Sequence, residues 1–414
     1  MQARADDLAE RHALAIAGRV PGAVVVPPTR AALVACVRDA AGAGAAIVPL
    51  GLGAHRGLGH APERYDVALS TRALTRIIDY VPADMTVTVE SGTTLAALDA
   101  VLAREGQWLP LAAPLPAETT VGGLIAADLS GLLRAAQGRV RDYVIGIAMV
   151  TAEGREARAG GRVVKNVAGY DLMKLLIGSL GTLAIVTEAT VKIRPRPETL
   201  RVVALTCADR DAGLALATRL VDLDEVALAI AMLATPGEAR PTLCCLLGGV
   251  AVDVGATRER LLHHARVVEA VVTCDEPADG PIPSALLAGA RDLPRVAPGE
   301  LVLRAAALRT RAPGLAAALL ADLGDLAVHA LFDPRAGVLT IAVATDDAAG
   351  VIARARVVSA RHEATLTIER WPDALATSIE VWSPPPSALP LMRRIKQALD
   401  PARTLAPGRF VGRL

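Results

Sequence analysis

Three glycine-bearing segments mark places where the backbone could approach a ligand closely. They read GLGAHRGLG at 51–59, TVGG at 120–123 and GSLGT at 178–182. A glycine-rich loop can present several backbone N–H groups to an anion, and a missing Cβ lets a flat or charged group come near the chain. The glycines could therefore let the backbone approach a flat or charged ligand, although each segment alone is only a weak signal.

Several other kinds of site are not indicated. No GK[ST] follows the glycines of 51–59, which excludes a Walker loop, and no helix with a Rossmann fingerprint follows them either. The cysteines lack iron–sulfur and zinc spacing, so a metal centre would have to belong to another chain. Odd in number and set mostly among apolar residues, they are expected to be reduced core thiols: Cys36, Cys207, Cys244, Cys245 and Cys274.

Charge and hydropathy narrow the class of protein further. The net charge of +1 gives no electrostatic reason to bind nucleic acid or an anionic membrane surface. Mean hydropathy is +0.40, but no apolar run reaches the ~20 residues of a spanning helix. The first fifteen residues carry acidic side chains and no apolar signal core, which predicts a cytoplasmic protein.

Regular elements must hold the glycine segments in place. Residues 24–70 are typical of a βαβ unit, in which Thr29 caps a helix and a strand at 46–50 runs directly into the loop 51–59. Further strands are predicted at 74–81 and 85–90. Thr93 and Thr94 precede a helix expected at 95–104, and a proline-rich loop leads to Thr120 and a small-residue helix, whose start could hold a diphosphate.

The stretch from 160 to 197 combines a helix, a turn and a strand. Asp171 is placed to cap a short apolar helix at 171–177, and a β-rich run follows at 183–193. After Pro197 the pattern changes to β-rich pieces alternating with Ala/Leu-rich helices, which predicts an α+β domain with an antiparallel sheet and helices on one face. Within it, the Pro/Gly-rich residues 276–299 are expected to form an exposed excursion.

The whole string GGRVVKNVAGYDLMKLLIGSLGTLAIVTEATVKIRPRP at 160–197 resembles FAD-binding domains of the vanillyl-alcohol oxidase type, also called PCMH-type, especially those of 2-hydroxyacid dehydrogenases. The resemblance implies an α+β protein with a two-subdomain PCMH-type FAD-binding domain at 1–198. An α+β cap domain would occupy 199–390, and a C-terminal segment at 391–414 would return to the FAD domain.

The same resemblance implies which residues lie at FAD. The family pattern places the loop 51–59 and the TxGG motif against the diphosphate, and the later segments against the rest of the cofactor. Relatives with covalent FAD carry a loop histidine one position earlier than His55, so His55 is expected to be solvated and FAD non-covalent. The implied cofactor-binding residues are Gly51, Gly53, Ala54, Pro114, Thr120, Gly122, Gly123, Gly138, Arg141, Asp142, Asn166, Tyr170, Asp171, Gly178, Gly181, Thr182 and Ile185.

Substrate chemistry is less well indicated. Catalytic relatives often have an acid where this chain has Leu180, and a histidine run that is missing here. In both respects, and in length, the chain resembles the FAD-binding accessory subunits of bacterial glycolate oxidases. That implies a catalytic flavin subunit and an iron–sulfur subunit as partners, oxidation of glycolate or a related 2-hydroxyacid, and, through the complex, peripheral association with the inner face of the membrane.

Two alternatives stay open from sequence. One is a free-standing FAD-dependent D-2-hydroxyacid dehydrogenase, although no residue can be assigned as its catalytic base. The other is a flavin-free structural scaffold, which is motivated by Ala54 and Ala406, because both stand where the family pattern is usually polar.

Overall fold

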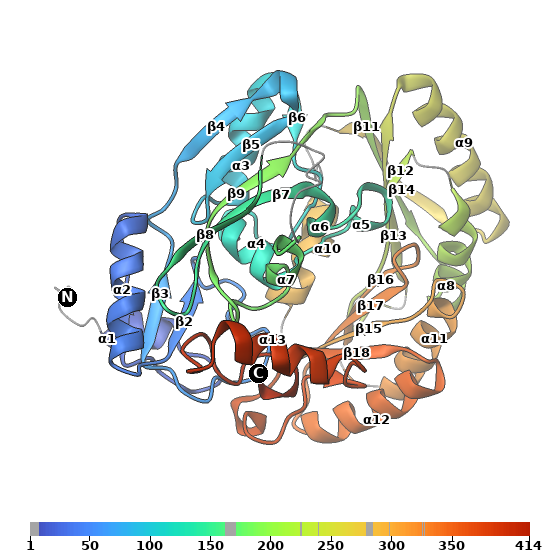
Figure 1. Cartoon of the computed structure of the whole chain (residues 1–414). Coiled ribbons are helices and arrows are strands. Elements are labelled where there is room, and N and C mark those ends of the chain that lie inside the picture. The colour runs from blue at the N-terminus through green and yellow to red at the C-terminus, as the bar shows by residue number, and fades with distance from the viewer. Residues whose placement is uncertain are drawn as a thin grey trace.

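The computed structural model places the chain in two halves that lie side by side (Figure 1). The blue-to-green half holds two small sheets, and the yellow-to-red half holds one large sheet with helices on its outer side. The C-terminal helix α13 crosses from one half toward the other. The structure describes residues 8–161, 171–223, 226–238, 240–278, 285–297, 299–324, 326 and 328–414.

A three-stranded parallel sheet carries the first glycine loop. Its strands β1 (Ala23–Val25), β2 (Ile47–Leu50) and β3 (Val67–Ser70) lie in the order β1-β3-β2. Helix α2 (Arg30–Gly42) connects β1 to β2 and begins where the Thr29 hydroxyl accepts a hydrogen bond from Ala32 N at 3.2 Å. The predicted βαβ unit is confirmed, with β3 inserted between its two strands.

A five-stranded antiparallel sheet forms the second part of this half. The side chains of Val89, Val144 and Val191 lie in its core, together with those of Leu124 and Ile125. Its strand order is β4-β5-β9-β7-β8. The bounds are β4 (Ile77–Val81), β5 (Thr86–Glu90), β7 (Val144–Val150), β8 (Glu156–Gly160) and β9 (Ile185–Lys192).

Short helices connect and flank these strands. The Thr94 hydroxyl caps α3 by accepting from Ala97 N at 3.2 Å. The helix predicted at 171–177 is shorter than expected, because α7 begins after Leu172, and Asp171 instead pairs with Lys174 at 2.5 Å. The helices are α1 (Leu8–Ala13), α3 (Leu95–Leu102), α4 (Val121–Ala127), α5 (Arg134–Gln137), α6 (Val140–Tyr143) and α7 (Met173–Leu176). A two-stranded ribbon pairs β6 (Gln107–Trp108) with β10 (Arg194–Pro195).

The other half is built on one antiparallel sheet, which confirms the predicted α+β cap. Within the described residues its strand order is β14-β11-β13-β12-β16-β17-β15-β18-β19. The strands are β11 (Thr199–Thr206), β12 (Ala227–Ala234), β13 (Thr242–Gly249), β14 (Val271–Ala278), β15 (Leu301–Ala306), β16 (Val328–Asp333), β17 (Val338–Val343), β18 (Thr365–Arg370) and β19 (Trp382–Ser383).

The two faces of this sheet are covered differently. Four helices, α8 (Arg210–Arg219), α9 (Ala251–Val267), α11 (Ala312–Leu323) and α12 (Ala348–Arg361), bury its outer face in the largest apolar cluster (Figure 1). The inner face packs on α10 (Ala285–Val296) and on the loop before α5. The exposed excursion predicted at 276–299 is therefore wrong in its second part, because Leu287, Ala290 and Leu293 bury the apolar face of α10.

The C-terminal segment packs against the first half. Helix α13 (Leu389–Leu399) leads to Leu405, which runs parallel to Ile47. Ala406 N donates to Ile47 O at 2.7 Å, and Ile47 N donates to Thr404 O at 2.7 Å. This edge brings residues 405–410 beside the loop 51–59, while the domain boundaries at 198 and 390 stay predictions. No helix among the described residues is long and apolar enough to cross a membrane.

Candidate functional site

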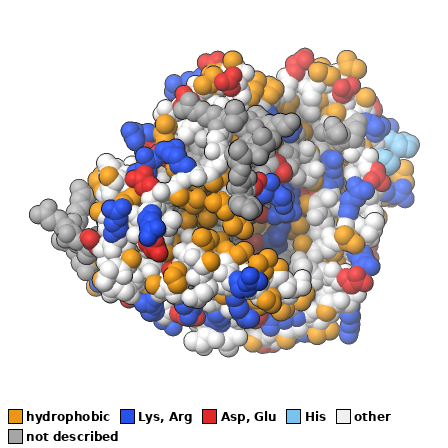
Figure 2. Space-filling model, in the orientation of Figure 1, with side chains coloured by type: hydrophobic (Ala, Val, Ile, Leu, Met, Phe, Trp, Pro, Cys, Tyr) orange, Lys and Arg blue, Asp and Glu red, His pale blue; other side chains and the backbone are white. Residues whose placement is uncertain are grey.

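Three cavities adjoin one another, two of them between the two halves and the third within the first half and the C-terminal segment. The largest, the interdomain cavity, has a volume of about 390 Å³ and reaches from Asp128 to Glu369. A second cavity of about 330 Å³ shares Leu58 and Arg295 with it. The third, the loop cavity, measures about 70 Å³ and is lined by residues of the loop 51–59. Figure 2 shows Lys and Arg side chains within a recess near the centre of this face.

The first glycine segment forms one wall of the loop cavity. Gly51, Gly53 and Ala54 all line it, opposite Thr120 and Gly123. Gly53 has a φ of +84°, which an L-residue adopts at a cost. Gly51 lies directly against the Thr120 side chain, so a Cβ at this position would collide with it.

The TVGG segment contributes in two ways. The Thr120 hydroxyl caps α4 by accepting from Gly123 N at 3.1 Å, which engages that N–H within the protein. Gly122 faces away from the cavity and packs on Ser91, where an added Cβ would come within 2.9 Å of Ser91 Cβ. Thr120 and Gly123 therefore line the cavity, and Gly122 allows α4 to approach β5.

Residues of the third glycine segment have different surroundings. Gly178 lines the interdomain cavity, whereas Thr182 borders a separate apolar hollow beside α13. Gly181 has a φ of +72° and lies against Pro49, at the end of β2. Ile185 is buried in the core between α2 and the strands, at 2% exposure.

The remaining predicted residues spread more widely. Pro114 lines the interdomain cavity. Gly138 has a φ of +96° and ends α5, where Asp142 caps α6 by accepting from Arg139 N at 2.8 Å. Arg141, Asp142 and Asp171 are exposed. Asn166 and Tyr170 lie outside the described residues, so any contacts of theirs with a cofactor stay predictions.

The loop histidine differs from the sequence expectation. His55 is not a solvated side chain, because it lies in the cavity wall and its Nε2 is 2.6 Å from the Thr119 hydroxyl. Burial, with a smaller contribution from the Arg295 charge, lowers the pKa of His55 to about 3. The imidazole is therefore neutral at physiological pH.

Arg409 is a candidate site residue that sequence analysis missed. It lines the loop cavity, is 3% exposed, and donates from Nη2 to Arg56 O at 2.7 Å and to Leu58 O. Burial lowers the pKa of Arg409 to about 10, and among the described residues no carboxylate pairs with it. A buried cation without a counter-ion is costly unless an anion binds beside it.

A polar row crosses the inner face of the large sheet at the interdomain cavity. Cross-strand pairing aligns Thr340 of β17 with Arg304 of β15, and Arg304 with Thr367 of β18. The row continues to Leu331 on one side and Trp382 on the other. All five side chains line the cavity, because partners in register point to the same face.

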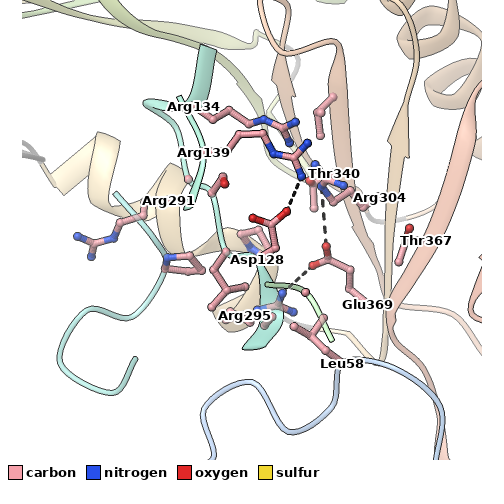
Figure 3. Close-up of a pocket in the computed structure, with 18 of the residues that line it drawn as sticks. Leu58, Asp128, Arg134, Arg139, Arg291, Arg295, Arg304, Thr340, Thr367 and Glu369 are labelled. Carbon is pink, nitrogen blue, oxygen red and sulfur yellow. Dashed lines mark hydrogen bonds and ion pairs between the residues drawn. The ribbon is translucent and has the colours of Figure 1, made fainter. Parts of the chain in front are cut away.

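Arginines dominate the charge in the interdomain cavity. Figure 3 shows Arg134, Arg139 and Arg304 gathered above Asp128 and Glu369. Arg139 pairs with Asp128, and Arg295 pairs with Glu369 at 2.8 Å. The Nε of Arg304 lies 3.9 Å from the same glutamate, which leaves most of its donors for another partner.

Asp333 is a buried carboxyl at the rim of this cavity. Its Oδ1 accepts from Ala336 N at 2.8 Å, yet burial outweighs that bond and raises the pKa of Asp333 from 3.8 to about 6. In the unfolded chain the group ionises near pH 4. Between pH 4 and 6 unfolding therefore releases a proton, and stability falls as the pH rises.

Asp333→Asn is expected to remove this pH-dependent loss of stability, because the amide cannot ionise and its oxygen can keep the hydrogen bond to Ala336 N. We expect a free energy of unfolding higher by up to about 3 kcal/mol at pH 7.5, from 1.36 kcal/mol per pKa unit. Urea unfolding between pH 4 and 8 checks it, with the exposed Asp253→Asn as control. If the free energy of unfolding of Asp333→Asn fell with pH as steeply as that of wild type, the prediction would be contradicted.

The lining fits a polar, anionic cofactor. Besides Arg409 Nη1, several buried nitrogen atoms that line the second and loop cavities have no hydrogen-bond partner among the described residues: His55 Nδ1, Arg295 Nε, Arg370 Nε and Trp371 Nε1. Buried donors are normally satisfied, so these atoms indicate a ligand or water. No group of three or more metal-binding side chains occurs among the described residues.

Comparison with known proteins agrees with this geometry. A domain family described as an FAD binding domain matches residues 21–160. Glycolate oxidase subunit GlcE of Escherichia coli is 42% identical over 130 residues, which are 31% of this chain and 37% of that protein. Glycolate oxidase subunit GlcD of Bacillus subtilis is 36% identical over 170 residues, 40% of this chain and 36% of that protein. The aligned parts thus span little more than a third of these relatives.

Solved structures share the fold over almost the whole chain. p-Cresol methylhydroxylase with substrate bound has a TM-score of 0.68 at 16% identity and covers 94% of this chain and 88% of its own. 4-Ethylphenol oxidase from Gulosibacter chungangensis has a TM-score of 0.69 at 16% identity and covers 95% and 90%. The chain therefore contains an FAD binding domain and has the fold of the PCMH-type FAD-linked oxidases.

Proposed function

We propose that the chain is the FAD-binding subunit of a glycolate oxidase-like complex, with FAD held non-covalently between the two halves. Glycolate or a related 2-hydroxyacid loses two electrons and two protons to become the 2-oxoacid. The electrons pass to a catalytic flavin subunit and an iron–sulfur subunit. The observation that carries this proposal is that the glycine loop of the FAD binding domain and Arg409 of the C-terminal segment line one cavity system with an arginine-lined space.

Each part of this cavity system has a distinct task. The backbone of 51–54 and the Arg409 guanidinium would hold the diphosphate, since both line the loop cavity. FAD, when bound, supplies a two-electron acceptor. Residues of the large sheet face the other end of the space, where they would orient an acid and exclude water. The contacts predicted for Gly138, Arg141, Asp142, Asn166, Tyr170 and Asp171 belong to this proposal.

A free-standing D-2-hydroxyacid dehydrogenase is the second candidate. It is favoured by the interdomain cavity itself, because the space and its arginines belong to this one chain. A D-lactate dehydrogenase of Archaeoglobus fulgidus is 39% identical over 150 residues, 36% of this chain and 33% of that protein. The FAD binding domain removes the reason to prefer a flavin-free scaffold.

An absorption spectrum of the purified chain, followed by anaerobic addition of glycolate and of D-lactate, tests these candidates. Flavin bands that persist with the isolated chain and bleach when partner subunits are added support the leading proposal. Bands that bleach with the isolated chain favour the free-standing dehydrogenase. A chain that stays colourless after incubation with FAD, with and without those subunits, would contradict both.

Arg409→Gln is expected to weaken FAD binding by about 10- to 100-fold. The variant removes the buried cation and its bonds to Arg56 O and Leu58 O, and a hydrogen bond to a charged group is worth about 1.5–3 kcal/mol. Fluorescence titration of the stripped protein with FAD measures the change. The matched control is Arg403→Gln, because Arg403 pairs with Glu63 at the surface. Equal affinity in the two variants would place the diphosphate elsewhere.

A further inference from the structure

We propose that Arg134 and Arg304 form a carboxylate-binding pair in the interdomain cavity, so that this chain itself binds the 2-hydroxyacid or its 2-oxoacid product. The inference rests on the proposed function only for the identity of the acid. The pair itself follows from the cavity, the sheet register and the few protein contacts of the two guanidinium groups, since Arg304 has one long contact, to Glu369, and Arg134 makes no ion pair among the described residues.

Two independent structural elements bring the pair together. Arg304 projects from β15 in the polar row of the large sheet. Arg134 begins α5, in the FAD-binding half, directly after Leu132 and Leu133, which are buried against the inner face of the same sheet. Those two leucines hold α5 at the cavity, and Figure 3 shows both guanidinium groups on the same side of it.

Arg134 differs from the other arginines of the cavity in forming no ion pair with a carboxylate among the described residues. Arg139 is neutralised by Asp128, Arg291 by Asp292 at 2.6 Å, and Arg295 by Glu369. Among the described residues the Arg134 side chain makes no hydrogen bond or ion pair, and Figure 3 draws no dashed line to it. Its guanidinium donors are therefore free for a ligand.

Electrostatics supports the same reading. The pKa of Arg134 is lowered by burial first and then by the positive charges of Arg304 and Arg139, with smaller opposing effects of Asp333 and Asp128. Two neighbouring cations with few counter-charges repel each other in the free protein. A carboxylate between them would relieve that repulsion, and a planar guanidinium can bind it through two parallel hydrogen bonds.

The neighbouring side chains point to a 2-hydroxy- or 2-oxocarboxylate rather than a simple fatty acid. Thr340 and Thr367 flank Arg304 in the polar row, so their hydroxyls lie within one strand spacing of it. A hydroxyl can donate to a 2-oxo group or accept from a 2-hydroxyl group. An acid with its second oxygen on the adjacent carbon would engage an arginine and a threonine together.

Equilibrium binding of oxalate to the FAD-loaded chain tests the proposal. Oxalate carries oxygens on adjacent carbons and has no C–H to oxidise, so binding is measured without turnover. Isothermal titration in 0.1 M KCl would compare wild type with Arg134→Gln, Arg304→Gln and Arg134→Lys. Arg354→Gln is the matched control, because Arg354 of α12 pairs with Asp322 of α11, and neither residue lines the cavity.

We expect Arg134→Gln and Arg304→Gln each to raise the dissociation constant for oxalate on the order of 30-fold, as truncating one partner of a desolvated charge pair does. Arg134→Lys should recover part of the affinity, because charge returns without the planar fork. Absence of oxalate binding to wild type up to 10 mM, or equal binding in wild type and both glutamine variants, would overturn the proposal. If no 2-hydroxyacid reduces the flavin even with the partner subunits present, but oxalate binding still needs Arg134, the proposed reaction fails and the carboxylate pair stands.

Discussion

FAD is expected to be lost from the protein when Gly181 is replaced by valine. The backbone at Gly181 has a φ of +72°, where an L-residue costs about 1–2 kcal/mol, and a Cβ would lie 2.5 Å from Pro49 Cγ. Pro49 belongs to β2, which delivers the chain into Gly51. A branched side chain would therefore push the start of the loop 51–59 away from Thr120 and open the loop cavity.

The flavin absorbance of the purified variant, relative to protein, measures this loss. Circular dichroism should show helical content close to that of wild type, because the collision is local. Gly44→Val is the matched control: Gly44 also has a positive φ, of +65°, but a Cβ there would meet nothing within 4 Å. Full flavin occupancy in Gly181→Val would show that this turn does not support the cofactor site.

Lys396→Met is expected to lower the free energy of unfolding by about 3–5 kcal/mol, the usual cost of leaving one member of a buried ion pair alone. Lys396 Nζ donates to Asp400 Oδ2 at 2.6 Å, to Thr182 O at 2.7 Å and to Leu405 O at 2.8 Å. Asp400 is fully buried and also accepts from Leu405 N. The substitution would strand that carboxylate and release the C-terminal segment from β2.

Urea unfolding at pH 7.5 measures the effect, with Lys174→Met as the comparison. Lys174 also pairs with an aspartate, but the two side chains are 49% and 41% exposed, and an exposed pair contributes about 0–1 kcal/mol. Adding Asp400→Asn to Lys396→Met should restore part of the stability, since the stranded charge is removed. Similar losses in the two lysine variants would mean that the buried network is not a major support of the segment.

Local signals in the sequence predicted local structure well. Thr29, Thr94 and Thr120 each cap a helix, and their short polar side chains ahead of apolar runs carry that information without help from the rest of the fold. The glycine spacing of the loop 51–59, directly after a strand, is a local signal of the same kind. Ile185 shows the limit of such reasoning, because its motif predicts a cofactor contact, whereas its side chain lies in the core beside α2.

The charged part of the site could not be predicted from sequence, for a physical reason. Arg134 and Arg409 stand in stretches rich in arginine, where most side chains are solvated or paired. What distinguishes these two is burial without a counter-ion, which depends on elements hundreds of residues away. Helix α10 could not be predicted for a related reason. The prolines and glycines of 276–299 indicate a loop, and the apolar face of α10 is recognisable only where it packs on the inner face of the sheet.

The bond between Arg409 and Arg56 O joins residues 353 positions apart, and this separation constrains when the cofactor can be held. A nascent chain that has already folded its three-stranded sheet would possess the glycine loop but neither the bridge from Leu405 to Ile47 nor the buried cation. Because chains fold domain by domain as they leave the ribosome, the nucleotide pocket would stay open until residue 409 emerges. Under the proposed binding mode, FAD would be acquired only after residue 409 has been made, and loading of the cofactor would report that both halves of the fold are present.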